Sequence, residues 1–277
     1  MANPRPQRTS ALPETCASPR GQLVDGGHTI LYIGPAFPIA AHRNSVTVLA
    51  FGLDDAFEVA EHLGQPPGTG RLARSAVIPA GQWHRLHTPA STMAFLYLDA
   101  GDQSWQRLAA SATPGPRGCA IGIAAEDMAL QVLRRLRAQP CAQRADFLAL
   151  TSCLGIEAPR MDRRIEASLA RLRSDPSLAH RVSEHATQAG LSVSQFQRLF
   201  TQSTGLPWRR WRLWQRTSSA VRDIIAGASL TEAAHTAGFS SGAHFSDTFK
   251  AMFGMPPSNL SAIDLTWTVI DVRTSGP

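Results

Sequence analysis

Hydrogen-bonding side chains gather in two short segments near the C-terminal end of the chain. The segments read SVSQFQRLF from Ser192 and SSGAHFSDTFK from Ser240. Arginine and glutamine can each make paired hydrogen bonds to the edges of bases in a duplex, and hydroxyl groups and cations bind phosphate oxygens. Residues of these types can recognise nucleic acid if the fold turns them toward one side.

Both segments belong to a repeat, which runs ATQAGLSVSQFQRLFTQSTGLP from Ala186 and AHTAGFSSGAHFSDTFKAMFGMP from Ala234. In each copy a glycine follows the alanine by four residues, two phenylalanines stand four apart, and a glycine and a proline close the unit. Glycine permits the positive φ of a tight helix end, and phenylalanines four apart share one helix face. Each copy therefore predicts two helices joined by a short turn, a helix-turn-helix unit.

Ser192 and Ser240 stand at equivalent positions of the repeat, where the second helix needs an N-cap. If the phenylalanines of the first copy pack inward, Ser194, Gln197 and Arg198 face outward. Arg198 suits the O6/N7 edge of guanine and Gln197 the N6/N7 edge of adenine. The alternative is that Arg198 contacts only the phosphate backbone.

The second copy carries different residues at the outward positions, namely Ala243, Ser246 and Asp247. A carboxylate repels phosphate unless it accepts a hydrogen bond from cytosine or pairs with a cation. We therefore expect the second unit to position the protein on its target rather than to read sequence. His244 is expected on the solvent side, where it either touches the target or stays idle.

Residues 208–226, WRRWRLWQRTSSAVRDIIA, contain neither glycine nor proline and predict one long helix between the copies. At ~1.5 Å per residue this helix measures about 28 Å, close to the ~34 Å between successive major-groove faces. Trp208, Trp211 and Trp214 predict a buried stripe with arginines at its edge. Residues 178–262 hold eight cations and four acids, so positive charge is concentrated at the repeat, as phosphate binding requires.

The doubled motif resembles the DNA-binding domain of AraC/XylS-type transcription regulators. The resemblance covers the chain from near Leu178 onward and is carried by AxxxGFSS, FxxxFKxxFGMPP and the RRWRLW helix, with the better fit in the second copy. It implies double-stranded DNA as the partner. The residues expected to contact DNA are Ser192, Ser194, Gln195, Gln197, Arg198, Arg209, Arg210, Arg212, Ser241, His244 and Lys250.

The first half of the chain has a different residue pattern from the C-terminal repeat. HTILYIG, SVTVLAFGL, SAVIPAG and TMAFLYLD are rich in β-branched and apolar residues and are separated by turn residues, which predicts antiparallel strands of a sandwich or barrel. Pro79-Ala80-Gly81-Gln82-Trp83-His84 resembles the second cupin motif, and His42 resembles the first histidine of the other motif. A cupin-like sensor domain is expected in a regulator of this family.

The histidines could serve either a ligand pocket or a metal site. His42, Trp83, His84 and Arg85 are the expected lining of a small-molecule effector pocket. A facial metal set of His42, His84 and His87 is the alternative. The first cupin motif is incomplete, because Asn44 follows His42 where a second histidine is needed. We therefore predict no metal and no cofactor.

Helical spacing of apolar residues continues from 120 to 154, including Met128, Val132 and Leu136, and again from 159 to 174. The first stretch either mediates self-association, which would give a homodimer, or packs against the barrel. The second stretch is expected to join the two domains and to belong structurally to the second.

The chain has 277 residues, is 43% hydrophobic and 17% charged, and carries a net charge of +6. Its longest apolar run, Met93 to Leu98, is far below the ~18 residues of a membrane span. The N-terminus holds prolines and charges where a secretory signal would be apolar. These features predict a protein that stays in the cytoplasm and contacts no membrane.

The expected fold is two-domain α+β: a disordered segment 1–20, an antiparallel cupin-like β-barrel with following helices over 21–158, a connecting helix over 159–177, and an all-α domain over 178–265. The all-α domain contains the two helix-turn-helix units and their linker helix. The expected function is sequence-specific transcription regulation, activating or repressing, that responds to a small molecule in the barrel and involves no enzymatic activity. Two alternatives remain: a cupin-type metalloenzyme tethered to a DNA-binding module, and a constitutive DNA binder with an empty barrel.

Overall fold

A computed structural model describes residues 20–27, 29–62, 64–88, 91–98, 102, 104–156, 161–174 and 180–272. The segment 1–20, for which we expect disorder, lies outside these ranges except for Arg20, which begins the first strand. Among the helices within these ranges, none combines the length and apolar character that crossing a membrane requires.

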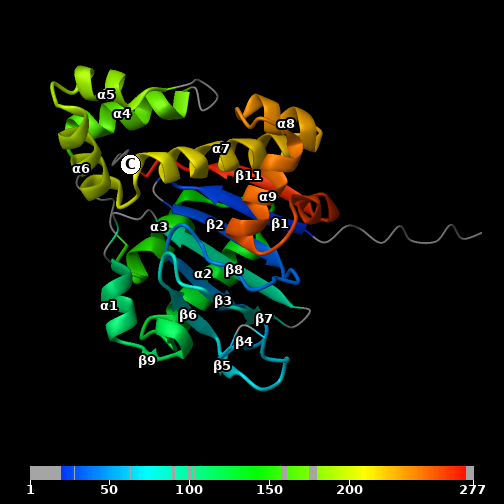
Figure 1. Ribbon diagram of the computed structural model, residues 1–277. Coiled ribbons are helices and arrows are strands. Elements are labelled where there is room, and N and C mark those ends of the chain that lie inside the picture. Colours follow the sequence, from blue (N-terminus) through cyan, green and yellow to red (C-terminus); the bar gives the residue numbers. More distant parts are fainter. Residues whose placement is uncertain are drawn as a thin grey trace, which may run out of the picture.

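The N-terminal region is sheet-rich, as predicted (Figure 1). A sheet of eight strands has the order β11-β1-β2-β8-β3-β6-β10-β9, and a second sheet has the order β5-β4-β7. The strands of the larger sheet are β1 Arg20–Asp25, β2 Thr29–Pro35, β3 Val48–Gly52, β6 Ser75–Ile78, β8 Thr92–Leu98, β9 Thr113–Pro114, β10 Ala120–Ile121 and β11 Asp264–Val269. The smaller sheet contains β4 Phe57–Val59, β5 Arg71–Ala73 and β7 Leu86–His87.

The predicted barrel is not closed, because the hydrogen-bonded order ends at β9 on one side and β11 on the other. Strands β9 and β10 are only two residues long and extend the sheet little at that edge. At the opposite edge β11, from the end of the chain, pairs in parallel with β1 over six residue pairs from Arg20↔Asp264 to Asp25↔Val269. The domain over 178–265 was expected to be all-α, whereas β11 begins at Asp264 and joins the C-terminal region to the N-terminal sheet.

Helices α2 (Glu126–Ala138) and α3 (Arg144–Cys153) lie in the stretch 120–154, where the spacing predicts helices, although Ala120 and Ile121 form β10. Helix α1 (Ser104–Ala110) precedes this stretch and was not predicted. The apolar face of α2, including Val132 and Leu136, is buried in one core with sheet residues such as Leu49. Met128 points away from this core and is 57% exposed. The apolar stripe therefore packs on the sheet, while self-association remains a prediction.

The C-terminal region is helical. Its elements are α4 (Arg163–Ser174), α5 (Val182–Gln188), α6 (Val193–Thr204), α7 (Trp208–Ile225), α8 (Leu230–Thr236), α9 (Gly242–Phe253) and the 3-10 helix η2 (Pro257–Ala262). Helix α7 runs across the top of the sheet, with α4, α5 and α6 near one end and α8 and α9 near the other (Figure 1). This is the predicted pair of helix-turn-helix units on one linker helix.

The two units differ in what they are packed against. The second unit shares one apolar core with the sheet, in which Phe245 and Phe249 join strand residues such as Tyr32 and Phe95. The first unit has a separate core made with α4, and from the N-terminal region this core includes buried Val46 and partly buried Tyr97. Apolar burial therefore holds the second unit to the sheet more extensively than the first.

Candidate nucleic-acid interface

Helix α6 of the first unit begins and ends at the residues that the repeat predicts. Ser192 is its N-cap: the Ser192 Oγ accepts from the Gln195 amide at 3.3 Å, and the Gln195 Oε1 accepts from the Ser192 amide at 3.0 Å. Gly205 ends the helix in the left-handed conformation with φ 65°. Gly190, in the turn before α6, also has φ 65°. These features fix the length and entry angle of the helix.

An aromatic core holds α6 from behind. Phe196 and Phe200 are fully buried, and their rings meet Trp208 edge-on at centroid distances of 5.7 Å and 5.1 Å. Such edge-to-face pairs are favourable in a packed core. Ser194, Gln197 and Arg198 lie on the opposite side and are exposed, as predicted. The structure thus presents these donors to solvent on a firmly packed helix, and their contact with DNA remains a prediction.

Helix α9 of the second unit departs from the expected capping. Ser241, not Ser240, is the N-cap, and its Oγ accepts from the His244 amide at 3.1 Å. The second copy has one more residue before its phenylalanines than the first, so the start of the helix moves one residue along the chain. Ser240 instead bonds the exposed His244 ring through its Oγ, 3.0 Å from Nδ1.

The outward face of α9 carries the residues expected there. Ala243, His244, Asp247 and Lys250 are exposed, whereas Ser241, at the start of the helix, and Ser246 are half-buried. One cation and one carboxylate stand on this face, whereas the first unit presents Arg198 without an acid on the same helix. A positioning role for the second unit remains a prediction.

The linker arginines fall into two groups. Arg209 and Arg210 are exposed at the start of α7, where Trp208 and Trp211 are buried beneath them. Arg212 is half-buried and donates from Nη1 to the His180 carbonyl at 3.1 Å. Arg212 thus helps to hold the segment before α5, in addition to any phosphate contact that we predict for it.

A pair of buried histidines lies beneath the first unit, and no motif in the repeat predicts it. His185 is fully buried and its Nε2 is 3.3 Å from the Nδ1 of buried His180. Burial, together with the nearby His180, Arg171 and Arg212, lowers the pKa of His185 to about 4, while Glu184 acts in the opposite direction. His185 is therefore uncharged at neutral pH and packs on Trp208 at 4.8 Å.

The structure also brings together two of the four residues expected in an effector pocket. His42 and His84 are buried, with ring centroids 4.3 Å apart. Burial and the neighbouring His42 lower the pKa of His84 to about 4, and burial lowers the pKa of His42. His87 lies apart from this pair and bonds the Gln65 carbonyl at 3.1 Å. Within the described ranges no three His, Cys, Asp or Glu side chains are grouped as a metal site would require.

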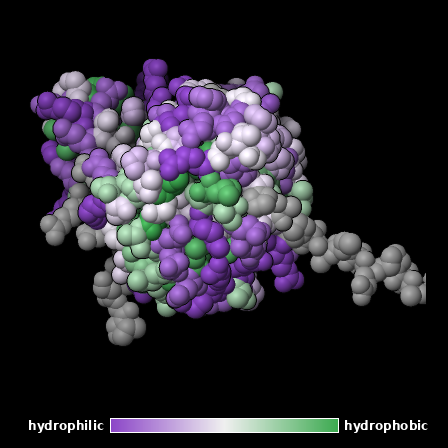
Figure 2. All heavy atoms as spheres, turned by 90° about the horizontal axis from the view of Figure 1, so that it is seen from below, coloured by the Kyte–Doolittle hydropathy of each residue, from purple (hydrophilic) through white to green (hydrophobic). Residues whose placement is uncertain are grey.

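Trp83 and Arg85 do not complete a pocket around this pair. Trp83 is 42% exposed, with the Arg43 guanidinium 5.6 Å from its ring, and Arg85 is half-buried. The face seen from below, near β4, β5 and β7, mixes hydrophilic and apolar side chains (Figure 2). The cavity between the sheet and α7 is lined by other residues, and it includes none of His42, Trp83, His84 and Arg85. The cupin-like motif therefore did not predict its position.

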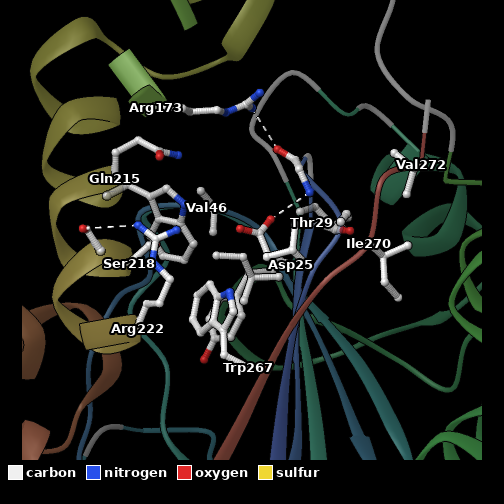
Figure 3. Close-up of a pocket in the computed structure, with 18 of the residues that line it drawn as sticks. Asp25, Thr29, Val46, Arg173, Gln215, Ser218, Arg222, Trp267, Ile270 and Val272 are labelled. Carbon is white, nitrogen blue, oxygen red and sulfur yellow. Dashed lines mark hydrogen bonds between the residues drawn. The ribbon is translucent and has the colours of Figure 1, made fainter. Parts of the chain in front are cut away.

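A cavity of about 380 Å³ lies between the sheet and helices α4 and α7 (Figure 3). Gln215, Ser218 and Arg222 enter it from α7, Asp25 and Thr29 from the strands, and Trp267 from β11. An adjoining apolar hollow of about 70 Å³ shares Tyr97, Trp214 and Trp267 with it. No sequence pattern indicates this site, because its walls come from segments far apart in the chain.

Comparison with known proteins agrees with this architecture. Residues 185–262 match the family described as a helix-turn-helix domain. No curated protein is similar enough in sequence to be matched. The match covers both helix-turn-helix units from His185 to the end of η2.

Solved structures extend the likeness to both domains. An apo variant of ToxT from Vibrio cholerae strain SCE256 is 11% identical, with a TM-score of 0.53 over 87% of this chain and 99% of that one. ToxT from Vibrio cholerae O395 bound to (E)-4-(8-methylnaphthalen-1-yl)but-3-enoic acid is 13% identical, with a TM-score of 0.51 over 84% of this chain and 98% of that one. A transcriptional regulator from Chromobacterium violaceum with an AraC-type DNA-binding domain is 25% identical over 36% of this chain and 90% of that one, with a TM-score of 0.35. The ToxT structures establish the shared two-domain fold.

Proposed function

We infer that this chain, whose residues 185–262 form an AraC-type helix-turn-helix domain, is a sequence-specific DNA-binding transcription regulator. The observation that carries the conclusion is the pair of helices α6 and α9, each capped, packed from behind by phenylalanines, and exposing polar residues on its free face. A helix of this kind fits the major groove of B-form DNA.

The linker helix supports binding along one side of a duplex. Helix α7 has 18 residues. At ~1.5 Å per residue it measures about 27 Å, comparable with the ~34 Å between successive major-groove faces. Exposed Arg209 and Arg210 stand where they can bind phosphates between the two grooves.

Selection of DNA from a random pool by the purified full chain tests this function. We expect enriched fragments to share two short conserved blocks about one helical turn apart, with the block under α6 the more sharply defined. A variant in which Gln197 and Arg198 are both alanine should lose that block. Enrichment of no common sequence by the wild-type chain would refute sequence-specific regulation.

We further propose that the N-terminal region binds a small-molecule effector. A structure of ToxT, which shares this two-domain fold, holds an aromatic carboxylic acid. An effector changes DNA binding only if it has different affinities for two arrangements of the protein. We also propose that the protein has no enzymatic activity, acts in the cytoplasm and associates as a homodimer.

A further inference from the structure

One apolar side chain is exposed on the recognition helix of the first unit. Val193 is the first residue of α6, directly after the N-cap Ser192, and is 40% exposed. Within helices α4 to α9, all of whose residues the structure describes, no other large hydrophobic side chain is exposed to this degree. An exposed apolar group gains free energy when a partner removes it from water. Val193 is therefore a candidate contact residue that the polar pattern of the repeat does not indicate.

The polar residues beside Val193 hold the first turn of α6 in place. The Ser192 Oγ accepts from the Gln195 amide at 3.3 Å and lies 3.2 Å from the Ser194 Oγ. The Gln195 Oε1 accepts in turn from the Ser192 amide at 3.0 Å. This capping network fixes the backbone that carries Val193. A valine in a helix also has one strongly preferred rotamer, so its methyl groups are held in place before any partner binds.

Val193 stands beside the residues expected to bond bases. It is four residues before exposed Gln197, so the two share one helix face, and exposed Arg198 follows directly. In Figure 1, α6 lies at one end of α7, to the side of the sheet. The N-terminal residues of a recognition helix contact base edges in the major groove. There thymine presents its C5-methyl group, which apolar side chains contact.

The second unit offers no apolar group at the equivalent position. The phenylalanines of the two copies place Gly242, the first residue of α9, where α6 has Val193. Glycine has no side chain that could pack on a methyl group. An apolar contact at the first helical position therefore distinguishes the first unit from the second.

We propose that Val193 is a specificity-determining residue that packs on the C5-methyl group of a thymine in the major groove. This thymine lies in the block under α6, next to the bases that Gln197 and Arg198 are expected to bond. The inference rests on the DNA-binding function proposed above. It names one base of the target and the chemical group by which that base is recognised.

Replacing the thymines of the selected α6 block by uracil, one at a time, tests this contact. Uracil pairs with adenine as thymine does and lacks only the methyl group. Gel-shift titration of the full chain at fixed salt gives the affinity for each duplex. For the wild type we expect one position at which uracil weakens binding about fourfold, the change equivalent to exposing one methyl group. In Val193→Ala the difference between thymine and uracil at that position should fall below about twofold.

A matched control separates the contact from a general effect of the substitution. Val269→Ala makes the same change at an exposed valine of β11, outside both helix-turn-helix units, and should keep the full difference between thymine and uracil. Because Val193 is exposed, Val193→Ala should also keep the wild-type free energy of unfolding in urea titration. The absence of any uracil-sensitive position, or an equal difference in wild type and Val193→Ala, would overturn the inference.

The same experiments separate this inference from the proposed function. A chain that selects a conserved sequence but is indifferent to uracil throughout the α6 block keeps the regulatory function and loses the assignment of Val193. Selection of no common sequence would refute both, because a chain that binds all DNA alike has no particular thymine to recognise.

Discussion

Replacing His185 by phenylalanine should make the first helix-turn-helix unit less sensitive to acid. His185 is fully buried against Trp208, and burial together with nearby His180, Arg171 and Arg212 lowers its pKa from 6.5 to about 4. The unfolded chain therefore takes up a proton on this side chain at a higher pH than the folded chain does. The folded state keeps its full stability above pH 6.5 and loses stability as the pH falls from 6.5 toward 4.

The size of the effect follows from these two pKa values. For a single site with pKa values of 6.5 unfolded and about 4 folded, the loss between pH 7.5 and pH 5 is at most about 2 kcal/mol. The charged residues around His185 are partly exposed, and solvent screens their effect. We therefore expect a loss of stability of about 1–2 kcal/mol. Phenylalanine cannot titrate, and it places another ring beside Phe196 and Trp208.

Native-state hydrogen exchange of the α6 amides at the two pH values measures the change, after correction for the intrinsic exchange rates. The opening free energy of α6 should fall by about 1–2 kcal/mol in the wild type and by clearly less in His185→Phe. His235→Phe, an exposed histidine on α8, is the control and should behave as the wild type. An unchanged acid response in His185→Phe would show that the buried histidine is not the cause.

Three further predictions concern the proposed DNA interface and the stability of the helices that form it. Arg198→Ala should weaken the selected DNA site by about 1–3 kcal/mol and random DNA much less, as gel-shift titration at matched salt would show; equal weakening of both would assign Arg198 to the backbone. Ser192→Ala removes the N-cap of α6 and should lower the free energy of unfolding by about 1 kcal/mol in urea titration, whereas Ser192→Asp should retain it. Gly254→Ala should destabilise the protein by more than about 1 kcal/mol, because Gly254 has φ 71° and an added Cβ would lie 2.6 Å from the Ala40 carbonyl; an unchanged melting temperature would contradict this close approach.

Local rules predicted most of the recognition machinery. The two helix-turn-helix units, the capping of α6 by Ser192 and the left-handed ends at Gly205 and Gly254 all follow from residue types at short spacings. Strands β3, β6 and β8 lie within the segments predicted from β-branched and apolar runs, and β2 extends one residue beyond its segment, to Pro35. Such features depend on contacts within one or two helical turns or within one strand, so the local sequence specifies them. The cap of α9 was misplaced by one residue, because the inserted residue left two adjacent serines to choose between.

Local sequence rules did not predict which residues the expected effector-pocket residues contact. The motif around His84 correctly placed His84 near His42, yet the pair forms a closed contact rather than the wall of the interdomain cavity. A motif fixes residue types along one segment, whereas a cavity depends on which other segments pack beside it. Trp267 and Arg222 are 45 positions apart in the numbering and belong to different elements, and neither carries a local pattern typical of a ligand site.

The sequence by itself determined the two recognition helices, the cap of α6 and the polar residues on their free faces, since each rests on short-range hydrogen bonds and helical periodicity. Tertiary structure alone decided that β11 pairs with β1 and forms one edge of the N-terminal sheet, that the second unit shares the core of that sheet, and that a cavity lies beneath α7. The physical reason is the sequence separation of the residues in contact. Pairing β1 with β11 joins residues more than 200 positions apart, and such contacts depend on the register and packing of the whole chain rather than on any segment within it.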